Sequence, residues 1–253
     1  MSARRFIKPM LRIALILLVG YLALVALVYI RQRSLLYFPS HINLLGGLTP
    51  WQDGNQTIGY CREAPRARTI WLMMHGNAGQ AASRDYVLPR MSDEDSLYVL
   101  EYPGYGLREG RPSMESINHA AAAAYQLLRA RNPHTPVCVL GESIGSGPAG
   151  VLARQYPPPE KIVLIVPFDV LANVAAEHFP FLPVRLLLHD NWNNVESLGH
   201  FTGPIEIYGA LEDSIIPIQH ARALAKSIPQ ARFIPISGGH NDWSANDQVN
   251  IRR

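Results

Sequence analysis

Short apolar runs alternate along this chain with stretches of helical character, and this alternation limits the possible folds more than any other feature. The apolar runs are Thr69–Met74, Leu97–Glu101, Val137–Leu140, Ile162–Val166, Ile205–Tyr208 and Phe233–Ile236. The stretches expected to be helical are Ala81–Met91, Met114–Arg131, Ser146–Gln155, Ile218–Ile228 and an apolar part of residues 170–189. Strands that alternate with helices predict a parallel sheet with both faces covered, which is the doubly wound α/β class.

Two weaker strands, Leu48–Gln52 and Thr57–Cys61, are expected to pair in antiparallel fashion at the start of the sheet. Together with the six apolar runs they predict a mostly parallel sheet of eight strands. In such a fold, ligands bind at the carboxyl ends of the parallel strands. The loops that directly follow the apolar runs are therefore the places to look for functional residues.

An uncharged apolar stretch of 18 residues, Ile13–Ile30, lies ahead of the predicted sheet. As a helix it would be about 27 Å long, close to the thickness of the hydrocarbon core of a bilayer. The stretch is longer than the apolar region of a cleaved signal peptide, and it lacks a clear small-x-small cleavage site. We therefore expect a single-pass signal anchor in residues 1–33 and one folded domain in residues 34–253. A cleaved signal and a buried core helix are the alternatives.

The charges are distributed unevenly along the chain. Six of the 23 Lys and Arg residues lie in residues 1–33, which contain no acidic residue; four precede the apolar stretch and two follow it. The positive-inside rule predicts a cytoplasmic N-terminus and a folded domain on the other side, which is the periplasm in a bacterium. The rest of the chain has 17 basic and 20 acidic residues, a balance that argues against nucleic-acid binding.

A G-x-S-x-G sequence, Gly141–Gly145, directly follows one of the apolar runs. Between a strand and a helix this spacing forms a tight turn, which holds the serine on a strained tip above the sheet. The amides at the start of the following helix favour negative charge that develops there. Ser143 is therefore the candidate nucleophile, and an ordinary strand–turn–helix with a solvated serine is the alternative.

The same segment contains a rival motif, the G-x-G-x-x-G formed by Gly145, Gly147 and Gly150, which is typical of dinucleotide-binding sites. Asp169, 19 positions after Gly150, stands where a ribose-binding carboxylate is expected. The first glycine of that fingerprint should come directly off the strand, whereas residues 142–144 intervene here. Dinucleotide binding therefore remains the alternative rather than the main hypothesis.

A nucleophilic serine in this setting requires an acid and then a histidine after later strands. Asp213 follows the run Ile205–Tyr208, and His240 follows the last apolar run in a glycine-containing loop. A histidine that takes and returns a proton needs a carboxylate to orient it. Asp213 and His240 are the expected partners of the serine, with Glu212 and Asp169 as alternative acids.

Two backbone N–H groups are expected to form an oxyanion hole. One belongs to Ile144, directly after the candidate nucleophile, and the other to the loop after Thr69–Met74. In that loop Asn77 is the first choice and Ala78 the alternative. One such donor contributes about 3–4 kcal/mol to transition-state stabilisation. His75, in the same loop, is expected to brace the loop rather than exchange protons.

Residues 167–203 are rich in Phe, Leu and Trp and are expected to form a small lid. A core helix that packs on the sheet is the alternative. Beside a membrane anchor, an apolar lid favours a lipophilic acyl substrate.

The two cysteines are too few for a disulfide scaffold or a four-thiolate zinc site. Cys61 and Cys138 belong to strands that are not expected to be neighbours, so no bridge between them is predicted. Cys138 lies in mid-strand and is expected to be buried and unreactive. Chemistry based on Ser, His and Asp requires no cofactor, and we expect neither a metal nor an organic one.

Five segments occur in a characteristic order: HGNAG from His75, EYPGYG from Glu101, GESIGSG, GALEDSIIP and GGHND. Over about residues 34–245 they resemble the α/β-hydrolase superfamily. With the N-terminal anchor and the RSLLYFP linker, the chain is most similar to the small membrane-anchored α/β-hydrolase domain-containing proteins of the type 13 and type 17 groups. A hydrophobic helix stands here in place of the cysteine-rich N-terminus of the type 17 group.

The resemblance implies that Ser143 is the nucleophile, Asp213 and His240 its partners, and Asn77 and Ile144 the oxyanion donors. It also implies hydrolysis of an ester or thioester, and the type 17 group acts as protein depalmitoylases. The hypothesis from the sequence is a membrane-anchored serine hydrolase that works through an acyl-enzyme. The alternatives are a dinucleotide-dependent enzyme and a non-catalytic scaffold with a hydrolase fold.

Overall fold

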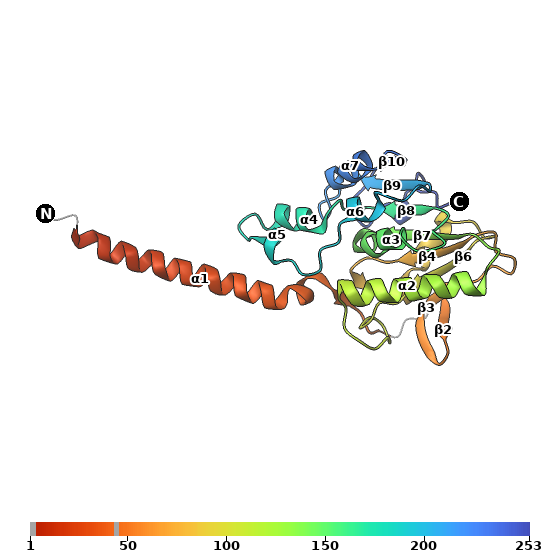
Figure 1. Cartoon of the computed structure of the whole chain (residues 1–253), viewed down its shortest axis with the longest axis horizontal. Helices are drawn as coiled ribbons and strands as arrows, with labels where there is room; N and C mark the ends of the chain where they lie inside the picture. The colour runs from red at the N-terminus through yellow and green to blue at the C-terminus, as the bar shows by residue number, and fades with distance from the viewer. Residues whose placement is uncertain (1–3, 43–45) are drawn as a thin grey trace.

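The structure is a computed structural model that describes residues 4–42 and 46–253 of the chain. Its centre is an eight-stranded sheet with the strand order β10-β9-β8-β7-β4-β6-β3-β2 (Figure 1). The strands are β2 (Thr49–Asp53), β3 (Gln56–Arg62), β4 (Ile70–Met74), β6 (Ser96–Leu100), β7 (Val137–Glu142), β8 (Ile162–Ile165), β9 (Ile205–Ala210) and β10 (Ala231–Ile236).

The strands from β10 to β6 in this order all pair in parallel. At the other edge β3 pairs with β6, and β2 with β3, in antiparallel fashion. The predicted mostly parallel eight-stranded sheet with an antiparallel start is thereby confirmed. Strands β4, β6, β7 and β8 are buried along their whole length. This burial explains why they appear in the sequence as continuous apolar runs rather than as alternating patterns.

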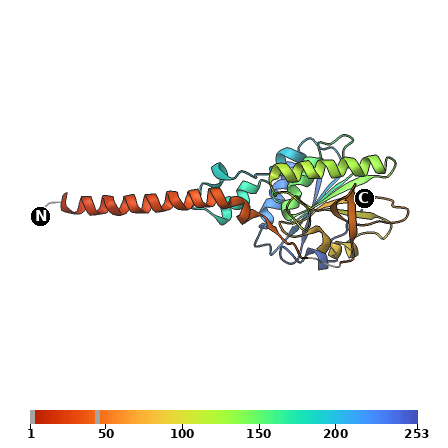
Figure 2. The same cartoon turned by 90° about the horizontal axis from the view of Figure 1, so that it is seen from below.

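The two faces of the sheet are covered unequally (Figure 2). One face packs against helices α2 (Met114–Arg131), α3 (Ser146–Leu152), α6 (Asn194–Leu198) and α7 (Ile218–Ser227). The other face packs against short 3-10 turns, η1 (Ala81–Ser83), η2 (Asp85–Arg90) and η4 (Trp243–Ala245), and against the C-terminal residues.

The predicted helix Ala81–Met91 is wrong, because this segment forms the two 3-10 turns η1 and η2. An α-helix there would have Pro89 in its interior, and proline both lacks the required N–H and clashes with the preceding turn. The side chain of Arg84 also turns inward, where it donates to the hydroxyl of Tyr86 and to the carbonyl of Ala78.

Helix α1 (Arg4–Leu36) projects from the domain as a single rod (Figures 1 and 2). Its part Lys8–Leu36 is long and apolar enough to cross a membrane, and its most apolar window is not buried in the protein. The helix continues to Leu36 and so includes the start of the RSLLYFP segment, residues 33–39, which was expected to be a linker. Directly after it, strand β1 (Phe38–Pro39) pairs in parallel with β5 (Ala78–Gly79), so the end of α1 is held against the domain.

The predicted lid segment, residues 167–203, divides into two parts. Helices α4 (Leu171–His178) and α5 (Val184–Leu187) lie toward α1, and two prolines between them break the helical stretch expected in residues 170–189. The remainder, with Trp192, Leu198 and Phe201, is buried in the core. We call residues 179–188, which follow α4 and include α5, the arm.

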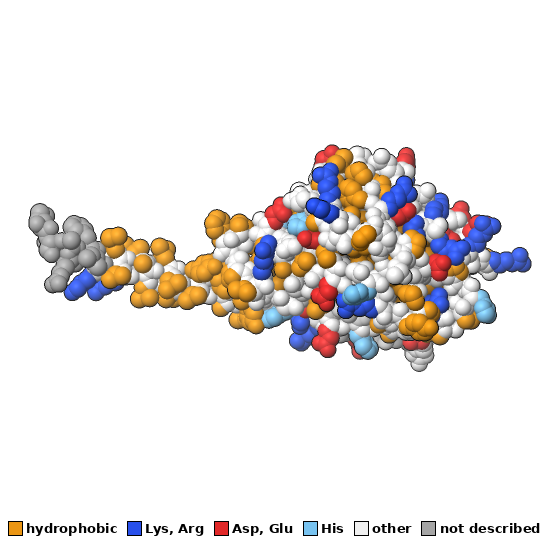
Figure 3. Space-filling view, turned by 45° about the horizontal axis from the view of Figure 1, so that its top comes forward, with side chains coloured by type: hydrophobic (Ala, Val, Ile, Leu, Met, Phe, Trp, Pro, Cys, Tyr) orange, Lys and Arg blue, Asp and Glu red, His pale blue; other side chains and the backbone are white. Residues whose placement is uncertain are grey.

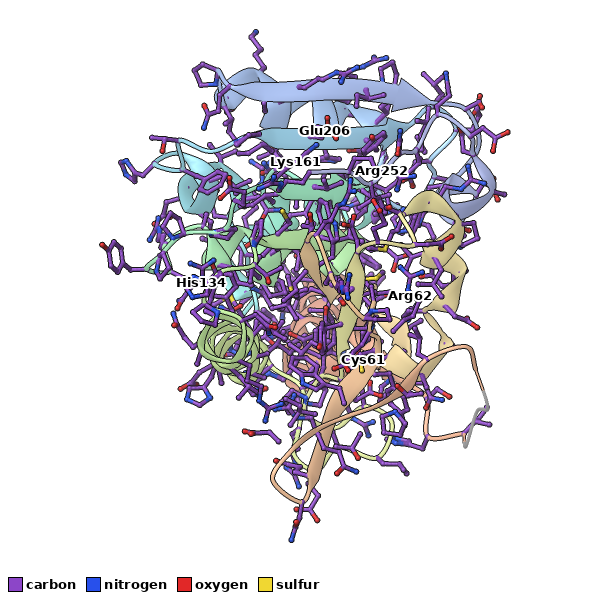
Figure 4. The ribbon with its side chains drawn as sticks, turned by 90° about the vertical axis from the view of Figure 1, so that its right-hand side faces the viewer. Cys61, Arg62, His134, Lys161, Glu206 and Arg252 are labelled. Carbon is purple, nitrogen blue, oxygen red and sulfur yellow. The ribbon has the colours of Figure 1, made fainter. Side chains whose placement is uncertain are left out.

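At the end of the sheet opposite α1, Lys161 makes an ion pair and a hydrogen bond with Glu206 and Arg252 (Figure 4). The Lys161 ammonium lies 3.0 Å from a carboxylate oxygen of Glu206 and donates to the carbonyl of Arg252 at 2.7 Å. These contacts fasten the C-terminus to the amino ends of β8 and β9, and the carboxyl ends of the strands remain free to carry a site.

Candidate active site

Ser143 stands at the end of β7 in a backbone conformation that side chains rarely adopt, with φ of 55°. The chain can turn this sharply only because the flanking positions are glycines. A Cβ on Gly141 would lie 2.7 Å from the Ala149 Cβ, and one on Gly145 would lie 2.2 Å from the Met74 carbonyl oxygen. The G-x-S-x-G spacing therefore follows from close packing around the turn, which lifts Ser143 above the sheet.

The structure brings Ser143, His240 and Asp213 together in a hydrogen-bonded chain. His240 Nε2 lies 2.9 Å from Ser143 Oγ, and His240 Nδ1 lies 2.7 Å from Asp213 Oδ2. The other oxygen of Asp213 accepts the backbone N–H groups of Ile215 and Ile216 at 2.9 and 2.8 Å. The carboxylate is thus fixed by the loop after β9, and it holds the imidazole in one orientation.

The two alternative acids lie elsewhere. Glu212 accepts the backbone N–H of Gly238 and so steadies the histidine loop rather than the histidine itself. Asp169 pairs with a different histidine, His220, whose Nδ1 lies 2.8 Å from the Asp169 carboxylate and whose Nε2 lies 3.0 Å from Glu177. This second cluster fastens α4 to α7, and neither alternative acid makes a described hydrogen bond to His240.

The predicted oxyanion donors Asn77 and Ile144 lie beside Ser143 and line the same pocket. The loop that carries Asn77 is held from below by the EYPGYG segment. The Tyr102 hydroxyl donates to the carbonyl of His75, and the Tyr105 hydroxyl donates to the carbonyl of Asn77, both at 2.7 Å.

His75 is fully buried under this loop, and its ring stacks on Tyr102 with 4.2 Å between the centroids. Burial lowers the pKa of His75, which favours the neutral imidazole. The side chain is therefore positioned to brace the loop, and it makes no described contact with Ser143, Asp213 or His240.

Glu142, the residue before the candidate nucleophile, joins three parts of the site. Its carboxylate accepts the Gly76 backbone N–H at 3.2 Å, the Tyr86 hydroxyl at 2.9 Å and the Trp243 indole N–H at 3.0 Å. Arg84 Nη1 lies 3.8 Å from the same carboxylate. Sequence reasoning missed this residue, because the x positions of G-x-S-x-G carry no signal.

An apolar cavity of about 350 Å³ lies over Ser143. Helix α4 forms one wall, and the loop after β9 forms another. Leu35 and Leu36, from the last turn of α1, also line it. The contribution of α1 to this cavity was not predicted, because no pattern in the sequence indicates that the apolar helix packs against the domain.

The rival glycine motif and the two cysteines are enclosed by protein atoms. A Cβ on Gly147 would lie 2.4 Å from the Trp192 ring, so protein fills the space beside the rival glycine motif. Cys61 and Cys138 are both buried and free, and burial raises the pKa of Cys138 to about 12. Within residues 4–42 and 46–253, no cluster of three or more His, Cys, Asp or Glu side chains is arranged to hold a metal ion.

Comparisons with known proteins give the family. No family model matches the chain. Uncharacterized protein Rv2307c of Mycobacterium tuberculosis is 31% identical over 232 residues, which cover 85% of this chain and 82% of that protein. Human alpha/beta hydrolase domain-containing protein 17C is 28% identical over 198 residues, which cover 76% of this chain and 58% of that protein.

Among solved structures, the Pyrococcus furiosus esterase Pf2001 superimposes with a TM-score of 0.62 at 11% identity. The superposition covers 82% of this chain and 95% of that one, and at this identity it indicates the fold alone. The sheet order, the strained serine turn and these similarities agree, and the chain belongs to the α/β-hydrolase superfamily.

Proposed function

We propose that this protein is a membrane-anchored serine hydrolase that cleaves carboxylic ester or thioester bonds. The observation that carries the proposal is the continuous hydrogen-bonded chain from Ser143 through His240 to Asp213. It lies at the carboxyl ends of the strands, next to a cavity that can receive a substrate. In this proposal residues 34–253 form the catalytic domain.

The proposed mechanism gives each of these groups one role. His240 Nε2 takes the proton of Ser143 Oγ as the oxygen attacks the acyl carbonyl. The backbone N–H groups of Asn77 and Ile144 receive the oxyanion, and Asp213 stabilises the imidazolium that forms. His240 then gives its proton to the leaving group, and an acyl-enzyme remains. Water, activated by the same histidine, releases the acid and restores the serine.

The cavity favours a substrate with an apolar acyl group. Most of its walls are aliphatic or aromatic side chains, including Leu171, Val174 and Phe179. Binding of an alkyl chain removes apolar surface of the chain and of the cavity walls from water. This burial is favourable by about 25 cal/mol per Å² of apolar surface. A lipophilic ester or thioester is therefore the proposed substrate class.

In the proposed arrangement α1 anchors the enzyme in a membrane. The basic residues ahead of its apolar stretch outnumber those that follow it, so the N-terminus is proposed to be cytoplasmic and the catalytic domain to lie on the other side.

The two alternative functions, a dinucleotide-dependent enzyme and a non-catalytic scaffold, lack a comparable observation. The glycines of the dinucleotide motif pack against protein atoms, and a scaffold does not require an aligned Ser, His and Asp.

Fluorophosphonate labelling of the detergent-extracted full-length chain tests the catalytic proposal. The wild type is expected to label, while Ser143→Ala abolishes labelling and His240→Ala reduces it by several orders of magnitude, because the serine then lacks its base. Ser214→Ala is the matched control, because Ser214 lines the same cavity outside the triad and labelling should persist.

A folded wild type that does not label would overturn the hydrolase proposal and favour the scaffold. Labelling that survives in Ser143→Ala would assign the nucleophile to another residue. Circular dichroism of each variant checks that the fold is retained.

A further inference from the structure

The arm, residues 179–188, lies along α1 rather than over the domain. The Tyr21 hydroxyl donates to the carbonyl of Phe181 at 2.9 Å. One turn before the end of α1, the Gln32 amide donates to the carbonyl of Leu187 at 3.2 Å and accepts the His189 N–H at 2.7 Å. Side chains of α1 therefore hold the backbone of the arm at two levels.

These contacts fix the depth of the arm relative to the apolar stretch. Tyr21 is nine residues before Ile30, which is about 14 Å along a helix, and half of a hydrocarbon core is about 15 Å thick. Arg33, which pairs with Asp190 at 3.0 Å, marks the polar boundary on the side of the domain. If Ile13–Ile30 spans the bilayer, Phe181 lies well inside the leaflet next to the domain.

The surface of the arm is apolar where it faces away from the protein. Phe179, Phe181 and Leu186 are 56%, 87% and 87% exposed. Hydrophobic surface runs from α1 onto the adjoining end of the domain (Figure 3). Such a continuous apolar patch is unusual in water and marks an interaction surface. The exposed Arg185 has a side chain long enough to extend toward the lipid headgroups.

Several backbone N–H groups of the arm have partners within the arm. The N–H groups of Leu182, Leu186 and Leu188 donate to carbonyls within the arm, and two prolines, Pro180 and Pro183, have no N–H to satisfy. In a bilayer each backbone polar group without a partner costs several kcal/mol, so irregular segments there require such partners.

The arm is connected to the candidate active site. Leu188 lines both the cavity over Ser143 and a narrow crevice between the arm and α1. Leu35, on the last turn of α1, lines the same cavity. The cavity wall is thus built from the two elements that the preceding observations place at the membrane.

We propose that the arm is inserted in the leaflet next to the domain, packed against α1, and that the acyl chain of the substrate reaches Ser143 from the bilayer between them. The occupant of the exposed apolar surface is the hydrocarbon of phospholipids. This inference rests on the proposed function, because it takes α1 to be the anchor and Ser143 to be the nucleophile.

Depth-dependent fluorescence quenching tests the insertion. The four native tryptophans are all buried in the domain, so a new exposed tryptophan can be measured above their background. Full-length Phe181→Trp in liposomes of dibrominated phosphatidylcholine should be quenched relative to unbrominated liposomes. Tyr156→Trp is the matched control, because Tyr156 is 89% exposed and precedes β8 at the opposite end of the sheet; it should not be quenched.

Ile16→Trp, inside the apolar stretch on the side away from the domain, separates this inference from the anchor itself. Quenching at position 16 but not at 181 would overturn the insertion of the arm and leave the anchor intact. Quenching at neither position would overturn both. A blue-shifted tryptophan at 181 that bromine does not quench would mean that protein, such as a second copy of the chain, covers the arm, and would also overturn the inference.

Substrate presentation tests the route. In Phe181→Asp/Leu186→Asp, hydrolysis of a long-chain ester held in phosphatidylcholine liposomes should fall at least about tenfold, because the arm loses its affinity for hydrocarbon. Hydrolysis of a water-soluble short-chain ester should be unchanged, because neither residue lines the cavity. Equal rates on the liposome substrate would overturn the route, whereas a wild type inactive on both esters would count against the proposed function itself.

Discussion

Glu142 and Ser143 are adjacent in the chain but have different tasks. Ser143 takes the strained conformation and turns its hydroxyl toward His240, while the Glu142 carboxylate turns toward Trp243. There it accepts from Gly76, in the proposed oxyanion loop of residues 75–79, and from Trp243, three residues after the candidate base. One carboxylate therefore fixes the nucleophile turn, the oxyanion loop and the histidine loop relative to each other.

At this scale we expect Glu142→Gln to lower kcat for a soluble ester at least about tenfold, because a shift of about 1 Å in an oxyanion donor has effects of this size. The amide nitrogen of the new glutamine would face a group that is itself a donor, such as the Gly76 N–H or the Trp243 indole N–H. The buried Arg84 would also lose its counter-charge. The free energy of unfolding should fall by about 3 kcal/mol. Steady-state kinetics measure kcat, and denaturant titration measures the free energy of unfolding.

Glu94→Gln is the control, because Glu94 pairs with Arg68 on the surface and such pairs contribute about 0–1 kcal/mol. Wild-type kcat and stability in Glu142→Gln would refute the positioning role.

At the scale of elements, the end of α1 is fastened to the oxyanion loop. Strands β1 and β5 form a short parallel ladder in which the Phe38 N–H donates to the carbonyl of Asn77 at 3.0 Å. The Asn77 side chain donates in turn to the carbonyl of Leu36, the last residue of α1, at 3.1 Å. A hydrogen bond to an unpaired carbonyl at a helix end stabilises that end. Helix α1 and the loop that would hold the oxyanion are thus one mechanical unit.

Asn77→Ala is therefore expected to reduce kcat several-fold even though the backbone N–H of residue 77 is retained, since the loop loses its side-chain bond to α1 and keeps only the backbone ladder. The free energy of unfolding should fall by about 1 kcal/mol. Asn132→Ala is a matched control: its side chain also donates to a helix carbonyl, that of Leu128 at 3.0 Å, but at the end of α2. Equal losses of kcat in the two variants would contradict the coupling.

At the scale of the whole molecule, features that a local sequence pattern specifies were predictable, whereas the contacts between α1 and the domain were not. Helix Met114–Arg131 was located at its observed bounds, since its capping residue and its stop lie beside it. The serine turn was predictable from the local G-x-S-x-G spacing, and the parallel sheet from the alternation of apolar runs with helical stretches. The bond between Tyr21 and Phe181 joins residues 160 positions apart, and no local pattern specifies that α1 and the arm meet.

Stability is a property of the whole molecule, and His75 makes it depend on pH. Burial lowers the pKa of His75, and the groups that face the ring are Glu101, 3.7 Å from Nε2, and Arg84, 3.4 Å from Nδ1. In the unfolded chain a histidine titrates near about 6.5. The unfolded state therefore binds a proton first as the pH falls, and the free energy of unfolding decreases below about pH 6.5.

One such proton contributes a slope of at most about 1.4 kcal/mol per pH unit. We expect denaturant titrations between pH 5 and pH 8 to give a smaller acid-side decrease for His75→Phe than for the wild type, since phenylalanine can still stack on Tyr102 but cannot bind a proton. His134→Phe, at an exposed histidine, is the control, and its curve should run parallel to the wild type. The difference between the stability curves of the wild type and His75→Phe measures the one proton that the buried ring cannot bind in the folded state. If the two curves run parallel, another group causes the loss of stability in acid.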